Sequence, residues 1–345
     1  MLSAGRGFSL LLLSLHPLLL HSAAAPVAAA AVRRSESGSE LQQPPVINLT
    51  GSAFKYLGFW GPGTPAEMEG FTNLAFANDA AQAIEQQRHG IQSLLKSHGI
   101  CLNYTTKWAV SLYPDCEARL AQVTPMFAPL LSNGTALGFF LGDELLWNGL
   151  SFGELQSYVR LMRAAFPAPV VLYYNEAYPS LLPTPAGTGQ YVGDVGHLPD
   201  RQLLQHVPRE LDWFSVDVYP DMFSAAGLPS VYHSFVLPKM LANQSLVLVP
   251  PFYTDINVTA EQVVSDCDDS DCDAAMARWA KMCVRWVTGG TADAQRIVAA
   301  MPYLWTSLWA PGHSGSRVGD GKDLPAARSV WEALGRAVVA RRTLT

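Results

Sequence analysis

The chain has 345 residues, of which 49% are hydrophobic and 15% are charged, and its formal net charge is -6. This is the composition of a globular protein with fewer charges than average, and the length allows one large domain or two ordinary ones. The acidic balance and the lack of a basic stripe argue against nucleic acid as a partner.

The N-terminal residues have the pattern of a secretory signal peptide. Arg6 precedes an apolar run over 8–20, which small residues follow, so we predict a signal peptide over 1–24. The run is shorter than the roughly 20 residues that a spanning helix needs; a signal anchor is the alternative. We expect a flexible linker over 25–50, one domain over 51–345, no transmembrane segment, and secretion or residence in the lumen of the secretory pathway.

Asparagine sequons and cysteines agree with export. Five sequons predict N-glycosylation, at Asn48, Asn103, Asn133, Asn243 and Asn257. In an oxidising compartment, disulfides are expected between neighbouring cysteines. The local pairs are Cys101 with Cys116 and Cys267 with Cys272, which leaves Cys283 unpaired. No cysteine or histidine spacing suits a zinc site, and we expect neither a metal nor a cofactor.

From residue 54 onward, short apolar strands alternate with helical patterns. The predicted strands cover 54–60, 70–78, 99–104, 136–144, 169–178, 211–220, 245–253 and 297–309. The predicted helices cover 79–99, 116–131, 151–166, 200–207, 230–243, 273–287 and 324–342, and the third of them starts with a Ser151–Glu154 capping box. Eight such units predict an α/β fold, a (β/α)8 TIM barrel. An open doubly wound sheet is the alternative, disfavoured because no glycine-rich phosphate loop follows the first strand.

The ends of the predicted strands are acidic and aromatic. In a barrel these ends meet at one mouth, where active sites lie. The candidate catalytic residues are Glu144, Glu176 and Asp217, and the candidate substrate-binding residues are Trp60, Asn78, Asp143, Asn175, Tyr219, Tyr253, Trp305 and Trp309. Aromatic faces stack on sugar rings, while carboxylates and amides bind hydroxyl groups. A carbohydrate is therefore the expected substrate or ligand.

Three segments, FFLGDE, WFSVDVYP and YLWTSLW, resemble secreted (β/α)8 glycoside hydrolases, and the resemblance covers about 54–340. It is a resemblance to the superfamily and to no single family. It implies a catalytic acid at the end of the fourth strand, where Glu144 stands. In the largest clan of these enzymes a glutamate on the seventh strand is the nucleophile, but the segment LVLVPPFYT has none.

The second carboxylate must then come from another strand, and Asp217 and Glu176 are the candidates. If strand alternation continues to the end of the fourth strand, Phe140, Gly142 and Glu144 share one side. Asp143 would then face the other way and orient Glu144 or bind a hydroxyl. Two alternatives remain: an inactive barrel that binds glycans or a protein, and a metal-dependent hydrolase, which the scarcity of suitable histidines disfavours.

Overall fold

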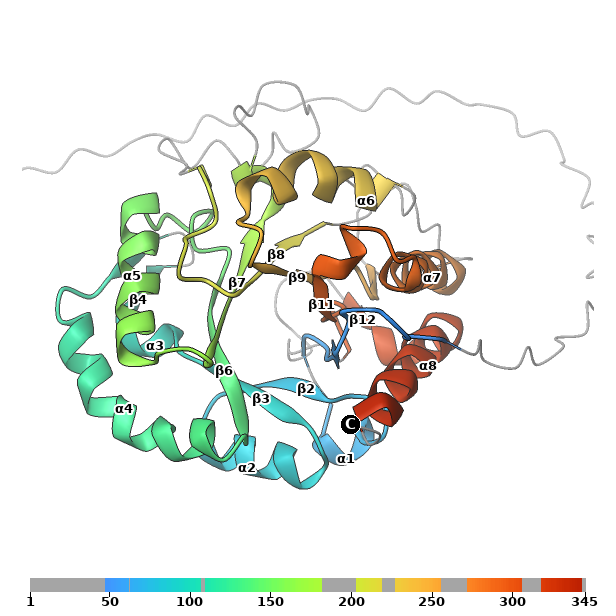
Figure 1. Cartoon of the computed structure of the whole chain (residues 1–345), viewed down its shortest axis with the longest axis horizontal. Helices are drawn as coiled ribbons and strands as arrows, with labels where there is room; N and C mark the ends of the chain where they lie inside the picture. The colour runs from blue at the N-terminus through green and yellow to red at the C-terminus, as the bar shows by residue number, and fades with distance from the viewer. Residues whose placement is uncertain are drawn as a thin grey trace, which may run out of the picture. The chain divides into compact units, whose positions relative to one another are not determined.

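The computed structural model describes residues 47–61, 63–106, 109–181, 203–218, 227–255, 272–305 and 318–342. Its centre is an eight-stranded parallel sheet that curls into a ring, with helices around the outside (Figure 1). The strands of the ring are β1 (Tyr56–Leu57), β2 (Leu74–Ala77), β3 (Gln92–Lys96), β6 (Ala136–Asp143), β7 (Val171–Ala177), β8 (Trp213–Asp217), β9 (Ser245–Leu248) and β11 (Ile297–Ala300). The predicted (β/α)8 barrel is confirmed.

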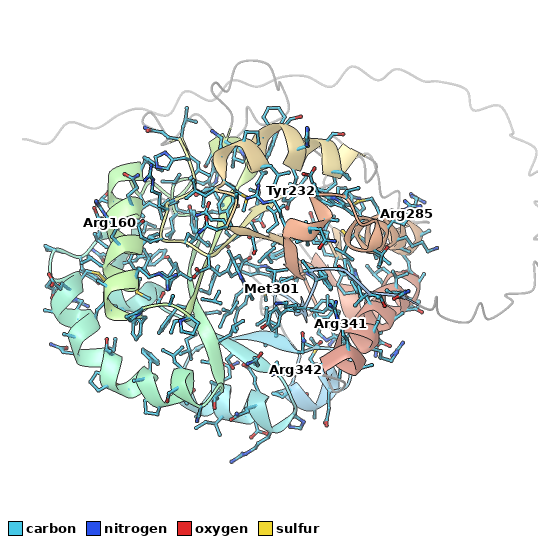
Figure 2. The ribbon with its side chains drawn as sticks, viewed as in Figure 1. Arg160, Tyr232, Arg285, Met301, Arg341 and Arg342 are labelled. Atoms are coloured by element: carbon cyan, nitrogen blue, oxygen red, sulfur yellow. A yellow bond between two sulfur atoms is a disulfide. The ribbon has the colours of Figure 1, made fainter. Side chains whose placement is uncertain are left out.

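The two faces of the sheet bury two separate sets of side chains. The inner set fills the barrel and includes Phe76, Phe140, Tyr173, Trp213 and Met301; Met301 lies near the centre of the ring in Figure 2. The outer set packs beneath the helices. Burial on both faces explains why the strands are almost continuously apolar rather than alternating.

The ring closes between β1 and β2 through one asparagine. Asn73, which is 2% exposed, accepts a hydrogen bond from the Leu57 amide at 2.9 Å and donates one to the Lys55 carbonyl at 2.9 Å. Its own backbone N–H donates to the Leu57 carbonyl at 3.0 Å. The Asn73 side chain thus pairs with the Leu57 N–H and the Lys55 carbonyl. In a fully closed barrel, backbone groups of β2 would make these hydrogen bonds.

Eight α-helices lie in the described ranges. They are α1 (Pro65–Met68), α2 (Ala80–Arg88), α3 (His98–Cys101), α4 (Cys116–Ser132), α5 (Phe152–Ala165), α6 (Leu228–Val231), α7 (Cys272–Thr288) and α8 (Pro325–Arg342). Helix α5 has the predicted capping box, with Ser151 and Glu154 each bonded to the other's backbone. The helices predicted over 116–131, 151–166, 273–287 and 324–342 are confirmed. The one predicted over 230–243 begins as α6 and continues in 3-10 and π turns to Lys239.

The third strand of the barrel differs from the prediction. The helix predicted over 79–99 begins as expected, where Asp79 caps α2, but it ends at Arg88. Gly90 then adopts a φ of 74°, a left-handed conformation that stops a helix after its last turn. The chain enters the barrel as β3, Gln92–Lys96. Of the strand predicted over 99–104, the residues up to Cys101 belong to α3, and the rest begins a hairpin outside the ring, of β4 (Leu102–Thr106) with β5 (Ala109–Leu112).

A disulfide joins Cys101 to Cys116, as the sequence predicted, and ties the segment before the hairpin to the start of α4. Cys267 lies outside the described residues, so its predicted pairing with Cys272 does too. Cys283 is buried. A separate two-stranded antiparallel sheet pairs β10 (Tyr253–Asp255) with β12 (Val318–Asp320), which follow each other only after α7 and β11.

The predicted glycosylation sites differ in accessibility. Asn48, Asn133 and Asn243 are exposed, and Asn103 is half-buried. Asn257 lies outside the described residues. In the described part of the chain, no helix combines the length and the apolar character needed to cross a membrane.

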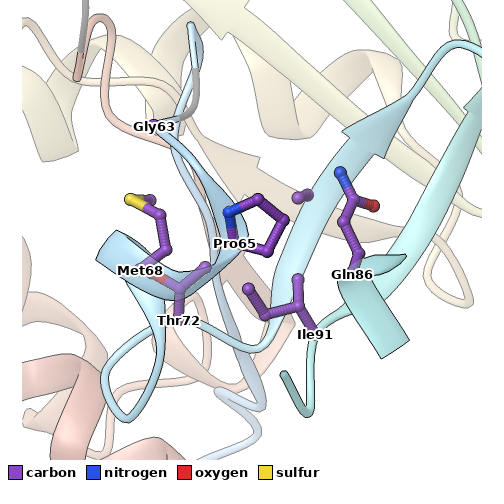
Figure 3. A pocket seen from close by; sticks show the side chains of 7 residues that line it. Gly63, Pro65, Met68, Thr72, Gln86 and Ile91 are labelled. Atoms are coloured by element: carbon purple, nitrogen blue, oxygen red, sulfur yellow. The ribbon is translucent and has the colours of Figure 1, made fainter. Parts of the chain in front are cut away.

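A small internal cavity of about 10 Å³ lies between α1, β2 and α2 (Figure 3). The Thr72 hydroxyl is buried without a hydrogen-bond partner, and its residue lines the cavity together with Gly63, Pro65, Met68, Ala75, Gln86 and Ile91. The volume fits one water molecule, which would satisfy the hydroxyl. The cavity is therefore part of the packing of this side of the barrel, away from the carboxyl ends of β6, β7 and β8.

Candidate active site

The end of β6 contains a β-bulge that decides which of its two acids faces the barrel. Phe140 pairs with Tyr173 on β7, but the next pair joins Asp143 to Asn175, with an irregularity between them. Gly142 accommodates the bulge with a φ of 158°. Because the bulge adds one residue, Asp143 follows Phe140 on the inner face. The expectation of unbroken alternation, which placed Glu144 inward, is wrong.

Three strands bring together Asp143, Asn175 and Asp217. The Asn175 amide nitrogen donates to Asp143 Oδ1 at 2.7 Å and to Asp217 Oδ1 at 3.0 Å. These two oxygens can therefore be no farther apart than the sum of the two distances, which is less than about 6 Å. Asn175 is fully buried and Asp217 is 5% exposed. The two acids and the amide that joins them define the candidate site.

A buried hydrogen-bond chain holds Asn175 in this position. The Ser215 hydroxyl on β8 donates to the Asn175 carbonyl oxygen, and the Tyr173 hydroxyl lies 2.7 Å from Ser215 Oγ. The carbonyl oxygen of the Asn175 side chain is thus occupied, which directs its NH2 group toward the two aspartates. The geometry of the acids depends on a pre-organised amide rather than on solvent.

Burial determines the charge of Asp143. It raises the pKa of this carboxyl from an ordinary 3.8 to about 6, against the opposing effects of the Asn175 hydrogen bond and the positive charge of Lys96. A carboxyl with such a pKa carries a proton at mildly acidic pH and can donate it to a bound ligand.

Lys96 supplies the positive charge. It is the last residue of β3, where it pairs with Phe140 in the register and follows Leu94 on the inner face. Its ammonium lies 6.0 Å from the centre of the Phe76 ring. Burial lowers the pKa of Lys96, and the charge of Asp143 opposes that effect.

Aromatic rings line the barrel beside these charges. Trp60 meets Phe76 with ring centroids 4.8 Å apart and Phe140 at 5.3 Å, both edge to face. It also contacts Tyr303 at 6.2 Å, and Tyr303 in turn meets Tyr253. Trp60 and Tyr253, both predicted to bind substrate, therefore belong to one aromatic group within reach of the barrel interior.

Glu176 points the other way. It follows Asn175 on β7, so its side chain leaves the opposite face of the strand, and it is fully buried. Its carboxylate accepts hydrogen bonds from the backbone amides of Leu146 at 3.1 Å, Trp147 at 3.3 Å and Ala177 at 2.9 Å. The hydroxyls of Ser180 and Tyr174 also donate to it.

Through these hydrogen bonds, Glu176 holds the segment that follows β6 in position. Burial raises the pKa of Glu176 to about 8, and the hydrogen bond from the Ala177 amide opposes this. The structure places this predicted catalytic candidate on the opposite face of β7 from Asn175, bonded to the backbone of the segment after β6.

Glu144 stands where β6 ends. Its φ of 49° is left-handed, and its backbone N–H donates to the Asn175 carbonyl at 2.9 Å. Its negative charge contributes to the raised pKa of Glu176. The two hydrogen bonds that join Asp143 to Asp217 come from the Asn175 amide.

The remaining predicted residues are scattered. Asn78 is exposed and bonds to the Gln82 side chain. Trp305 is fully buried in the outer layer, where it packs against the rings of Phe59 and Phe71. Its Nε1 donates a hydrogen bond to Glu67 at 3.3 Å. Tyr219 and Trp309 lie outside the described residues.

Within the described ranges no three His, Cys, Asp or Glu side chains are grouped to hold a metal ion.

Sequence reasoning missed Lys96, Ser215 and Tyr173. Lys96 was not identified because the third strand was predicted several residues too late in the sequence. The signal was the basic residue that directly follows the apolar residues of QSLLK, at the end of the strand. Ser215 and Tyr173 looked like ordinary strand residues, since only the register places Ser215 opposite Asn175, where it also bonds to Tyr173.

No protein-family model and no curated protein matches the chain. Solved structures with a similar course of the chain include glycoside hydrolases. An endo-1,4-β-xylanase from Caldicellulosiruptor owensensis has 9% identity and a TM-score of 0.49, covering 86% of this chain and 99% of that one. A GH113 β-mannanase from Alicyclobacillus acidocaldarius has 12% identity and a TM-score of 0.44, covering 84% and 97%. At this level the likeness concerns the fold, and the barrel assignment rests on the strand order and pairing described above.

Proposed function

We propose that this chain is a glycoside hydrolase that cleaves O-glycosidic bonds with Asp143 and Asp217. The observation that carries the proposal is the single Asn175 amide that bonds to both carboxylates. Carboxyl pairs about 5–5.5 Å apart are typical of glycosidases that retain the anomeric configuration, whereas inverting enzymes keep them about 6.5–9.5 Å apart. The limit set by the shared amide favours retention.

In the proposed mechanism, protonated Asp143 gives its proton to the glycosidic oxygen as the bond to the anomeric carbon breaks. The Asp217 carboxylate attacks that carbon from the other face and forms a glycosyl ester. Asp143, now a carboxylate, takes a proton from water, and the water oxygen displaces Asp217. One group thus acts as acid and then as base, and no electron acceptor is needed.

The environments of the two acids suit these different roles. Burial gives Asp143 a pKa of about 6, so it holds a proton at mildly acidic pH, as a general acid must. The amide hydrogen of Asn175 stabilises the negative charge of Asp217. The aromatic group around Trp60 offers rings on which the apolar face of a sugar can pack.

The experiment compares wild type with Asp143→Asn, Asp217→Asn and Glu144→Gln on a panel of neutral, N-acetylated and acidic glycans. We expect each aspartate variant to lose about 10²- to 10⁴-fold in kcat and Glu144→Gln to keep activity within a few-fold. Asp115→Asn is the matched control, because this carboxyl is 57% exposed and starts α4.

The outcomes separate the candidates. Loss of activity in Glu144→Gln alone would return the acid role to Glu144 and refute the assignment to Asp143. Binding of a glycan without any cleavage by wild type would instead favour the alternative of a barrel that binds carbohydrate and lacks catalysis.

We also propose that the protein is secreted and glycosylated. The pattern of 1–24 and the sequons support this proposal, and the Cys101–Cys116 disulfide is compatible with an oxidising compartment. Expression in a eukaryotic secretory host should yield protein in the medium whose mass falls on treatment with an N-glycan amidase. Retention of the whole product inside the cells would contradict the proposal.

A further inference from the structure

Among the residues that the structure describes, the ammonium group of Lys96, at the end of β3, has no hydrogen-bond acceptor. It lies 6.0 Å from the centre of the Phe76 ring. The charge of Asp143 acts on Lys96, but within the described part of the chain no carboxylate oxygen lies within the 4.0 Å of an ion pair with it. The side chain is half-buried, and an ammonium that no carboxylate of the described residues pairs with is available to an anionic ligand.

A second unsatisfied donor lies on the same ring. The indole Nε1 of Trp60 is buried and has no hydrogen-bond acceptor among the described residues. The Trp60 ring contacts Phe76 edge to face with centroids 4.8 Å apart. The Lys96 ammonium and the Trp60 indole therefore both lie beside the Phe76 ring, and neither has an acceptor in the part of the chain that the structure describes.

We propose that these two groups bind a carboxylate of the substrate, so that the glycan this chain recognises contains a uronic acid. A carboxylate has two acceptor oxygens, one for the ammonium and one for the indole. The ammonium also supplies the charge that a neutral sugar would leave uncompensated. The inference rests on the proposed function, because it assigns the substrate class of the same barrel mouth.

The nearby aspartates do not make an anionic substrate unsuitable. In the proposed reaction Asp143 is protonated before the glycosidic bond breaks, which removes the negative charge that acts on Lys96. A carboxylate of the substrate then takes the place of that negative charge beside the ammonium. Electrostatic attraction of this kind weakens with ionic strength, so the preference for an acidic glycan should diminish in high salt.

The test measures binding, so that it does not depend on cleavage. The probes are a glucuronic-acid-containing tetrasaccharide and its carboxyl-reduced counterpart. They are titrated calorimetrically into Asp217→Asn protein, in which we expect turnover to be about 10²- to 10⁴-fold slower. We expect tighter binding of the acidic probe, and Lys96→Gln should weaken it about 10- to 100-fold while changing the binding of the reduced probe little.

Two further variants keep the result interpretable. Lys96→Arg preserves the charge and should restore most of the preference, which a merely structural role of Lys96 would not predict. Lys55→Gln removes an exposed lysine and controls for net charge. Equal affinity for the two probes in the protein with Lys96 intact would overturn the inference.

The two proposals can fail independently. Cleavage of neutral glycans by wild type with no preference for the acidic probe would refute the carboxylate site and leave the two-aspartate mechanism standing. Binding of the acidic probe that depends on Lys96, without cleavage of any glycan by wild type, would support the carboxylate site and refute the mechanism.

Discussion

Replacement of Asp143 by asparagine is expected to stabilise the folded chain at neutral pH. Burial raises the pKa of Asp143 from 3.8 to about 6, so the folded state holds this proton more tightly than the unfolded state. Between about pH 4 and pH 6 the folded state therefore binds more protons, and the contribution of Asp143 to stability falls as pH rises. Above pH 6 the ionised carboxyl opposes folding.

The magnitude follows from the difference in pKa. A rise of about two units corresponds to about 3 kcal/mol, which is an upper limit because the side chain is only partly buried. Asparagine has nearly the same shape and can still accept the hydrogen bond from Asn175. Its advantage should be close to zero at pH 4 and should reach about 2–3 kcal/mol at pH 7.

Urea unfolding at pH 4, 5, 6 and 7 measures this directly, with the Cys101–Cys116 disulfide intact. Wild type, Asp143→Asn and the exposed control Asp115→Asn are compared at each pH, and the slopes must agree before the free energies are subtracted. If Asp143→Asn is less stable than wild type at pH 7, or if its difference does not vary with pH, the account of a buried, proton-holding acid is refuted.

Three other changes test the parts that position the site. Asn73→Ala should lower the free energy of unfolding by about 1–3 kcal/mol, since the buried Leu57 amide loses its acceptor; urea unfolding checks it, and an unchanged midpoint would contradict closure through Asn73. Replacing both Cys101 and Cys116 by serine should cost about 3 kcal/mol, the value for a loop of this length, and an unaltered thermal midpoint would speak against it. Glu176→Ala should cost about 1–3 kcal/mol, because the backbone amides of Leu146 and Trp147 lose their acceptor; full stability in urea would show that these bonds do not hold the segment.

Most of the barrel could be predicted from the sequence, because the start and end of most helices and strands depend on residues close together in the chain. A few neighbouring residues are enough to predict many of its elements. Examples are the apolar strand runs, the helix cap at Asp79 and the Ser151–Glu154 capping box. The prediction failed for the third strand because helical periodicity over 79–99 hid the stop at Gly90, whose role depends on its left-handed φ.

The candidate site was predictable in composition and unpredictable in detail. Asp143, Asn175 and Asp217 were all expected at strand ends, but which acid faces inward depends on a bulge at Gly142 that follows from the pairing of β6 with β7. Glu176 looked equally suitable in the sequence. Because β7 pairs with β8 without a bulge, Glu176 follows Asn175 onto the outer face of the sheet. Register is a property of two strands together, so one strand's residues do not reveal it.

Chemical rescue of Asp217→Ala by azide tests the central claim most directly. Removal of the proposed nucleophile opens space for the azide anion to attack the anomeric carbon of an aryl glycoside that wild type cleaves. If Asp217 is the nucleophile of a retaining hydrolase, azide should restore turnover and the NMR spectrum of the product should show a glycosyl azide of the opposite anomeric configuration to the substrate. Hydrolysis by Asp217→Ala at the wild-type rate without azide, or a glycosyl azide of unchanged configuration, would contradict the role of Asp217.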